Sequence, residues 1–168
     1  SKAFFDEYTL HYQKFCDYLQ ESNFRKSVFK IAIPTNATKE EKDKACKPIR
    51  DFVKKLLGRI VFLYFVQKKG WLGVSKGGDW GDGPHNFLRQ LFDGKFRPYK
   101  NFFNDILEPL FYNTLATDRG HEAWCSIFNC RIPFLNGGLF EPLRDYDWEK
   151  TDIIIPNTIF SNTKITKV

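Results

Sequence analysis

Two short acidic segments have the residue types that a nuclease site needs. Carboxylates near a lysine can bind a metal ion and activate water for phosphodiester cleavage, and this composition occurs in Glu40-Glu41-Lys42 and in Asp147-Trp148-Glu149-Lys150. Neither segment follows a clear strand with an upstream aspartate, which would help to bring the carboxylates to one place. We interpret both segments as solvated charge. A free-standing metal-dependent nuclease that uses Asp147 and Glu149 is an alternative.

A second group of residues has the chemistry of a zinc site. His121, Cys125 and Cys130 carry suitable ligand atoms, and His85 or Asp118 would be the fourth ligand. Structural zinc sites usually place their ligands in closely spaced pairs, which this run lacks. The three residues are therefore weak metal candidates, and we expect no cofactor in this stretch of chain.

The glycine-rich segment at residues 77–83 has features of a phosphate or cation loop. Glycine lets backbone amides approach an anion, and Asp79 and Asp82 could hold a cation. The segment lacks the Lys-Ser/Thr of a P-loop and the distal glutamate of an EF-hand. We therefore predict a plain mobile loop here.

Basic residues in the middle of the chain could follow a phosphate backbone. Residues 39–59 hold eight of them, partly offset by four acidic residues. The candidates for contact with DNA backbone are Lys54, Lys55, Arg59, Lys68 and Lys69. A solvated helix face is the alternative for this set, and a salt bridge on the helix is the alternative for Arg59.

A central helix must position several of these residues. Apolar residues recur at three- and four-residue spacing after Pro48, which suits the first helical turn. Residues 60–66 are apolar on every side, which predicts a helix covered all round. Lysines followed by Gly70 predict the end of the helix. Gly58 inside it predicts the close approach of another helix.

Four further helices are expected from local patterns. Aromatic spacing predicts one over residues 3–21, a capping box of Thr38 and Glu41 begins the next, and apolar spacing predicts two more over residues 86–92 and 99–115. Pro109 should kink or split the last of them. The type of residues 24–33 stays open.

The last third of the chain predicts short extended segments. Residues 132–135 and 153–156 are apolar runs, and Asn136-Gly137-Gly138 is a tight turn. Together these patterns predict a mainly α fold, an irregular helical domain around a buried central helix, with short extended segments near the C-terminus.

The composition limits the class of protein. A chain of 168 residues with 17% aromatic residues suits a single domain over residues 1–168, and a net charge of +6 favours nucleic acid or an acidic partner. No transmembrane run is visible, and four irregularly spaced cysteines indicate reduced thiols. We therefore expect a cytoplasmic protein, and one that is a fragment of a longer chain.

Three motifs in a fixed order resemble one family of enzymes. Residues 56–72 read Leu-Leu-Gly-Arg-Ile-Val-Phe-Leu-Tyr-Phe-Val-Gln-Lys-Lys-Gly-Trp-Leu. Asn-Phe-Phe and Leu-Glu-Pro-Leu-Phe follow at residues 101–103 and 107–111, and Arg-Ile-Pro-Phe-Leu-Asn-Gly-Gly-Leu-Phe-Glu follows at residues 131–141. This order resembles the helical connector of bacterial type IIG restriction-modification enzymes. The likeness covers roughly residues 50–160.

The resemblance implies a parent enzyme with two activities. Such enzymes fuse a restriction endonuclease to an adenine-specific DNA methyltransferase, and the connector lies between the two. They use S-adenosylmethionine as methyl donor, magnesium for cleavage and double-stranded DNA as substrate. The partners implied for this chain are therefore DNA and the neighbouring nuclease and methyltransferase domains.

The chain departs from the whole enzyme at its catalytic motifs. It has no Asn-Pro-Pro-Tyr, which grips a flipped adenine, and no Phe-x-Gly-x-Gly cofactor loop. No catalytic residue can be carried over. We therefore expect a non-catalytic connector that positions the catalytic modules and contacts DNA backbone. A protein-interaction scaffold that does not touch DNA, built around Trp71, Trp80 and the glycine-rich loop, is the alternative.

Overall fold

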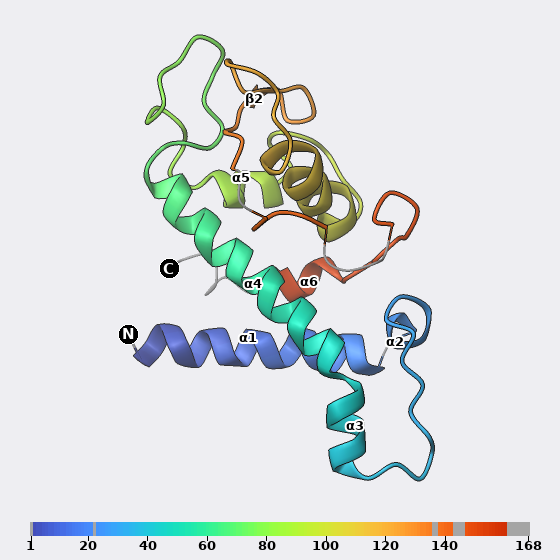
Figure 1. Cartoon of the computed structure of the whole chain (residues 1–168). Coiled ribbons are helices and arrows are strands. Elements are labelled where there is room, and N and C mark those ends of the chain that lie inside the picture. Colours follow the sequence, from blue (N-terminus) through green and yellow to red (C-terminus); the bar gives the residue numbers. More distant parts are fainter. Residues whose placement is uncertain (1, 22, 136–137, 143–146, 161–168) are drawn as a thin grey trace. The chain divides into compact units, whose positions relative to one another are not determined.

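The fold is mainly α, as the sequence predicts (Figure 1). The computed structural model describes residues 2–21, 23–135, 138–142 and 147–160. The chain forms two compact units, Ser1–Gly58 with Thr158–Val168, and Arg59–Asn157. None of the described helices combines the length and the apolar character needed to cross a membrane.

The first unit begins with three helices. They are α1 (Lys2–Glu21), α2 (Phe24–Ser27) and α3 (Lys39–Ala45). The aromatic spacing therefore predicted α1 correctly. Its Phe15 is buried, and the Phe15 ring lies 5.1 Å from that of Phe160 in an edge-to-face arrangement. The helix at α3 is also confirmed, since the Thr38 hydroxyl accepts a hydrogen bond from the Glu41 amide at 3.1 Å.

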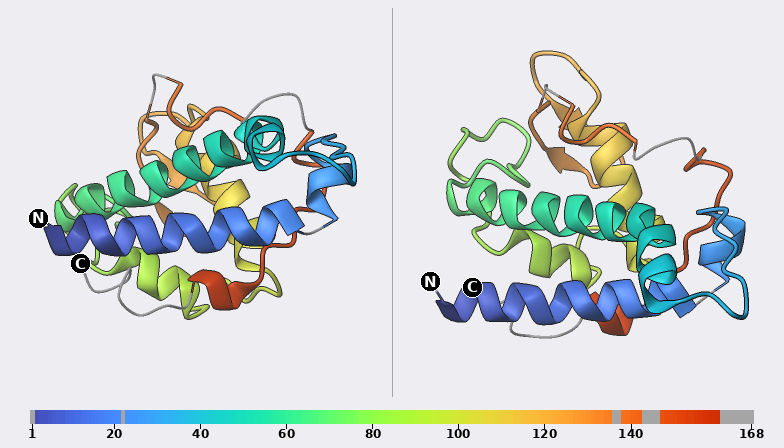
Figure 2. Two further views of the ribbon diagram at one scale, coloured as in Figure 1. Left: turned by 90° about the horizontal axis from the view of Figure 1, so that it is seen from below. Right: turned by 60° about the horizontal axis from the view of Figure 1, so that its bottom comes forward.

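The central helix α4 spans Lys47–Lys68. Pro48 lies in its first turn, and Cys46 separates it from α3, so the chain changes direction between these two helices (Figure 2). The predicted ending is confirmed, because Gly70 adopts a left-handed conformation with φ of 72°.

The prediction that residues 60–66 are covered on every side is wrong. Phe62 and Phe65 are 39% and 61% exposed, whereas Leu63 and Val66 are buried. The apolar run therefore has one open side, which composition alone does not reveal. Among the described residues, the predicted close helix neighbour of Gly58 is also absent, because a Cβ atom built there meets nothing within 4 Å.

Substitution of Gly58 by alanine should therefore stabilise the chain. The position is exposed inside a helix and has room for a methyl group, and alanine has the higher helix propensity. We expect the free energy of unfolding to rise by about 0.5–1 kcal/mol in urea titrations. A decrease in stability would show that Gly58 has a neighbour after all.

The second unit contains α5 (Phe87–Phe92) and two π-helical elements, η1 (Phe103–Leu107) and η2 (Pro109–Leu115). Both helices that we predicted in this region are present. Pro109 does not end the second one, since Glu108 keeps helical dihedrals with φ of −63° and ψ of −48°. The proline is the first residue of η2, and the helical run continues into it from η1 through Glu108.

The small sheet lies just before the first of the segments that we predicted to be extended. The structure has a small antiparallel pair, β1 (Trp124–Cys125) and β2 (Cys130–Arg131), and Val74 forms an isolated bridge with Arg131. Residues 132–135 and 153–156 are not strands, although Ile153 and Ile155 are buried. Asn136 and Gly137 of the predicted turn lie outside the described residues.

The first turn of η1 is held by the carboxylate of Asp105. This group accepts hydrogen bonds from the backbone amides of Asn101, at 2.9 Å, and Lys100, at 3.1 Å. Partial burial raises the pKa of Asp105, but these bonds, with one from the Asn104 side chain, outweigh it and lower the pKa below the ordinary value. The ionised carboxylate therefore stabilises the folded chain.

Asp105→Asn should weaken the chain in a pH-dependent way. A lowered pKa in the folded state gives stability that is present above the unfolded pKa, near 3.9, and is lost as pH falls through the folded value. We expect the variant to lose about 1–2 kcal/mol at pH 7 and to show a flatter stability profile below about pH 4. Equal profiles for both proteins would contradict the role of the ionised group.

Candidate functional site

Three segments far apart in the sequence meet at Arg59 of the second unit. Its side chain is 2% exposed. Nη2 donates to the backbone oxygen of Glu141 at 2.5 Å, and Nη1 lies 3.4 Å from the hydroxyl of Tyr112. Arg59, Tyr112 and Glu141 therefore connect α4, η2 and the segment after residue 137.

Aromatic rings surround the guanidinium group of Arg59. Its Cζ lies 5.2 Å from the ring centre of Phe111 and 5.7 Å from those of Tyr112 and Phe140. Phe111 and Phe140 also contact each other, with ring centres 5.7 Å apart. The faces of aromatic rings attract cations, most strongly where water is excluded. We call Arg59, Phe111, Tyr112, Phe140 and Glu141 the Arg59 cluster.

The Arg59 cluster corrects two sequence-based interpretations. No acidic side chain among the described residues forms an ion pair with Arg59, so the alternative of a salt-bridged Arg59 is wrong. Because the side chain is buried, Arg59 also cannot reach a DNA backbone. The cluster contains residues of all three resembling motifs: Arg59 from the first, Phe111 from the second, and Phe140 and Glu141 from the third. Tyr112 follows the second motif directly. Residues of the three motifs therefore pack together in one cluster.

The glycine-rich loop after α4 is fixed by backbone contacts. The amides of Gly81 and Gly83 both donate to the oxygen of Gly70, at 3.0 and 2.8 Å. A Cβ atom at Gly70 would lie 2.1 Å from the oxygen of Gly81, and one at Gly83 would lie 2.3 Å from that of Leu72. Close approach of two backbone segments therefore explains the glycines at these two positions without any ligand.

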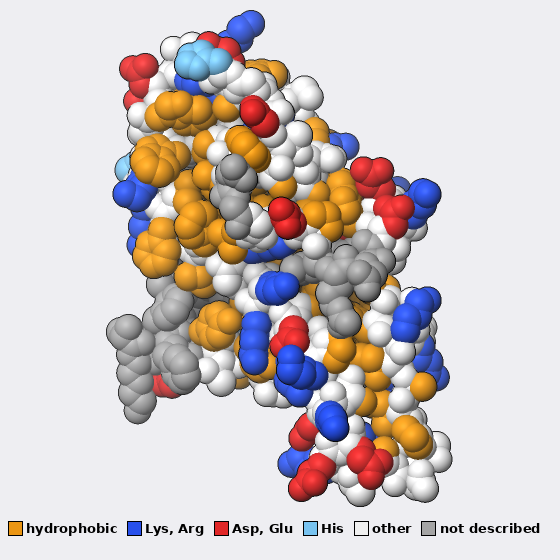
Figure 3. Space-filling view, viewed as in Figure 1, with side chains coloured by type: hydrophobic (Ala, Val, Ile, Leu, Met, Phe, Trp, Pro, Cys, Tyr) orange, Lys and Arg blue, Asp and Glu red, His pale blue; other side chains and the backbone are white. Residues whose placement is uncertain are grey.

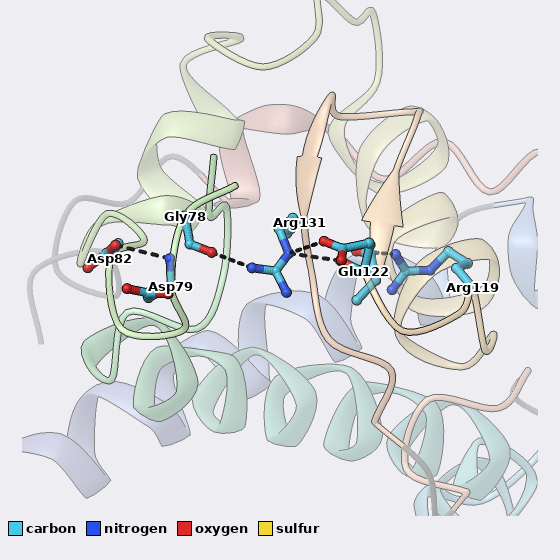
Figure 4. A network of polar contacts seen from close by, with 7 residues as sticks. Gly78, Asp79, Asp82, Arg119, Glu122 and Arg131 are labelled. Atoms are coloured by element: carbon cyan, nitrogen blue, oxygen red, sulfur yellow. Dashed lines mark hydrogen bonds and ion pairs between the residues drawn. The ribbon is translucent and has the colours of Figure 1, made fainter. Parts of the chain in front are cut away.

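Arg131 ties this loop to the β1–β2 pair (Figure 4). Its guanidinium donates to the backbone oxygens of Gly78 and Glu122, the latter at 2.8 Å, and lies 4.3 Å from the ring centre of Trp80. Arg119 makes a similar internal network, with hydrogen bonds to three backbone oxygens (Thr114, Ala123 and Ile132). These arginines are structural, although the sequence analysis did not single them out.

The other four backbone-contact candidates are exposed. Lys54 and Lys55 belong to the first unit, and Lys68 and Lys69 to the second. The ammonium group of Lys69 lies 5.1 Å from the ring centre of Trp71. The unit that holds Lys54 and Lys55 has a net positive charge, whereas the unit that holds Lys68 and Lys69 has no net charge.

The net charge of the chain lies on the first unit. This unit holds 14 basic and 8 acidic residues, and the second holds 12 of each, so the first carries +6 and the second zero. Residues 24–55 alone hold 10 basic and 4 acidic residues. Figure 3 shows basic side chains along the N-terminal part of α4. We call the exposed lysines of this region the basic surface: Lys26, Lys30, Lys39, Lys42, Lys44, Lys47, Lys54 and Lys55.

The metal candidates do not form a ligand set. Cys125 and Cys130 are buried and opposite each other in the strand pair, whereas His121 is exposed. Burial raises the pKa of the Cys130 thiol to about 12, with a further rise from Cys125 that Arg119 partly offsets. No group of three or more His, Cys, Asp or Glu side chains in the described part of the chain could hold a metal ion.

The two nuclease-like segments belong to different units, Glu40 and Glu41 to the first and Asp147 and Glu149 to the second. Glu40 and Glu41 are exposed in the first turn of α3. Asp147 accepts a hydrogen bond from the Glu149 amide at 3.1 Å and pairs with Lys150 at 3.7 Å, so it stabilises a local turn. This agrees with the interpretation of both segments as surface charge.

Comparison of the chain with protein-family models, with curated proteins and with solved structures gave no match.

Proposed function

We propose that this chain is the non-catalytic helical connector of a bacterial restriction-modification enzyme, and that its first unit contacts the DNA backbone. The distribution of charge carries this proposal: the entire excess of +6 lies on the first unit, with eight exposed lysines on its basic surface. The order of the three motifs supplies the enzyme family. The connector would position a nuclease and an adenine-specific methyltransferase in the cytoplasm.

Lysine side chains on such a surface suit phosphates better than bases. The ammonium group is a compact charge on a flexible stem, and neutralising a phosphate releases condensed counterions whatever the base sequence. Phosphate contacts fix the position of a protein on the duplex and carry no direct sequence information. In the parent enzyme, sequence recognition, S-adenosylmethionine and magnesium would therefore belong to the other domains.

Binding of two unrelated duplexes tests the proposal. We expect the 168-residue chain to bind two duplexes of about 20 base pairs with affinities within about threefold of each other at about 50 mM salt, because backbone contacts are the same for both. Fluorescence anisotropy of labelled DNA measures this. A strong preference for one sequence would show base readout and contradict a backbone contact.

Alanine at Asp147 and Glu149 should leave DNA cleavage by the parent enzyme unchanged. Both carboxylates are exposed, and Asp147 pairs only with its own turn and with Lys150 among the described residues. Surface substitutions of this kind change the free energy of unfolding by about 0.5 kcal/mol or less. Cleavage of plasmid DNA at matched enzyme concentration measures the outcome. Loss of cleavage in a folded double variant would favour the metal-dependent nuclease instead.

A further inference from the structure

One side of α4 in the second unit presents aromatic rings to solvent. Phe62 and Phe65 lie three residues apart and are 39% and 61% exposed, and Trp71 is 41% exposed. Lys69 follows Phe65 by four residues, and its ammonium group lies 5.1 Å from the Trp71 ring. We call these four residues the Phe65 stripe. Figure 3 shows apolar side chains gathered over this part of the helix.

The stripe is held on rigid supports. The ring of Phe62 lies 6.1 Å from that of Phe140, which belongs to the Arg59 cluster. Trp71 follows Gly70, whose backbone oxygen accepts two hydrogen bonds from the glycine-rich loop. Exposed aromatic rings on a fixed backbone lose little conformational entropy on binding, which is typical of the residues that dominate protein interfaces.

The charges beside the stripe select the kind of partner. Lys68 and Lys69 are exposed there, while the second unit as a whole has no net charge. A neutral unit lacks the excess positive charge on which nucleic-acid binding depends. A second copy of the chain is also disfavoured, because a two-fold interface uses the same patch on both copies and would bring two sets of these lysines into one interface.

We propose that the Phe65 stripe binds an acidic amphipathic helix of another protein domain. Phe62 and Phe65 lie three residues apart on one face of α4, and Lys69 follows Phe65 by four residues in the turn after the helix, so a partner helix can pack its apolar side along the two rings. Glutamate or aspartate at the edge of that partner would meet Lys68 and Lys69. The inference uses contacts of the second unit alone, so it does not depend on DNA binding by the first.

A matched pair of peptides tests the inference. The first is a helical peptide with leucine along one face and glutamate on both flanks, and the second has lysine in place of every glutamate. Fluorescence anisotropy of labelled peptides with the whole chain should show binding of the glutamate peptide and about tenfold or more weaker binding of the lysine peptide. Equal affinities, or no binding of the glutamate peptide, would overturn the proposal.

Variants place the binding on the stripe. Phe65→Ala and Lys69→Glu should each weaken binding of the glutamate peptide about tenfold or more. Ile154 is an apolar residue of the same unit that is 46% exposed, and Ile154→Ala should leave the affinity for the peptide unchanged. Phe65 is the better test than Phe62 because Phe62 also packs on Phe140. Unchanged affinity in Phe65→Ala would overturn the assignment.

Two further measurements exclude other occupants. Light scattering should show no dimer that forms as the protein concentration rises and that Phe65→Ala abolishes. The affinity of the chain for a single-stranded oligothymidine should be the same with and without the Phe65→Ala substitution. A dimer or a DNA complex that depends on Phe65 would identify a different occupant and overturn the proposal.

Discussion

Replacement of Arg59 by alanine is expected to lower the free energy of unfolding of the second unit by about 3 kcal/mol. The substitution removes a fully buried side chain and leaves a cavity among the rings of Phe111, Tyr112 and Phe140. It also removes the hydrogen bonds to Tyr112 and to the backbone of Glu141. Both changes act on the same three segments.

Two further variants separate the charge of Arg59 from its volume. Arg59→Lys keeps a cation but loses the planar group that stacks on rings and bonds two partners, so we expect a loss of about 2 kcal/mol. Arg59→Met fills most of the space without charge, and we expect a loss of about 1 kcal/mol. A methionine variant more stable than the natural chain would show that the guanidinium costs more than it contributes.

The four tryptophans make this measurement specific. They are Trp71, Trp80, Trp124 and Trp148, and all lie in the second unit. Urea titrations followed by tryptophan fluorescence therefore report on that unit. Lys95→Ala, an exposed residue of the same unit, is the matched control and should change stability by less than about 0.5 kcal/mol.

Replacement of both Lys54 and Lys55 by glutamine should weaken binding to duplex DNA. At about 0.1 M salt, we expect the affinity to fall roughly tenfold for each phosphate that the variant no longer neutralises. These lysines are exposed on the basic surface of the first unit. The slope of log affinity against log salt should also become less steep by about 0.9 for each such phosphate. Salt titrations of a labelled duplex measure both effects.

The end of α4 and the turn after it offer the matched control. Lys68 and Lys69 are also exposed and also adjacent, but they belong to the neutral second unit. Glutamine at both positions removes the same charge, and we expect it to change affinity for DNA by less than about threefold. Equal effects of the two double variants would show that position on the charged unit does not matter.

The helices could be predicted from sequence because their signals are local. Apolar spacing defined α1, and the hydroxyl of Thr38 together with Glu41 marked the start of α3. The exposed side of α4 could not be predicted, because periodicity does not show which apolar residues find neighbours. The contacts of Phe65 depend on segments remote in sequence or on another protein.

Long-range contacts explain the other differences. Arg59 suggested a surface cation because arginine is rarely buried, and only the approach of Phe111 and Phe140 makes its burial favourable. The strands β1 and β2 have two residues each, too short for an alternating pattern to mark them. The charge difference between the units was present in the sequence, but it became visible only when the boundary at Gly58 was known.

The salt dependence of duplex binding by the unmodified chain tests the central claim most directly. If the basic surface contacts the DNA backbone, affinity should fall steeply between about 50 and 200 mM salt, with a slope of about −0.9 for each phosphate neutralised. Binding that does not change with salt, or no binding at about 50 mM, would contradict a backbone contact by the first unit.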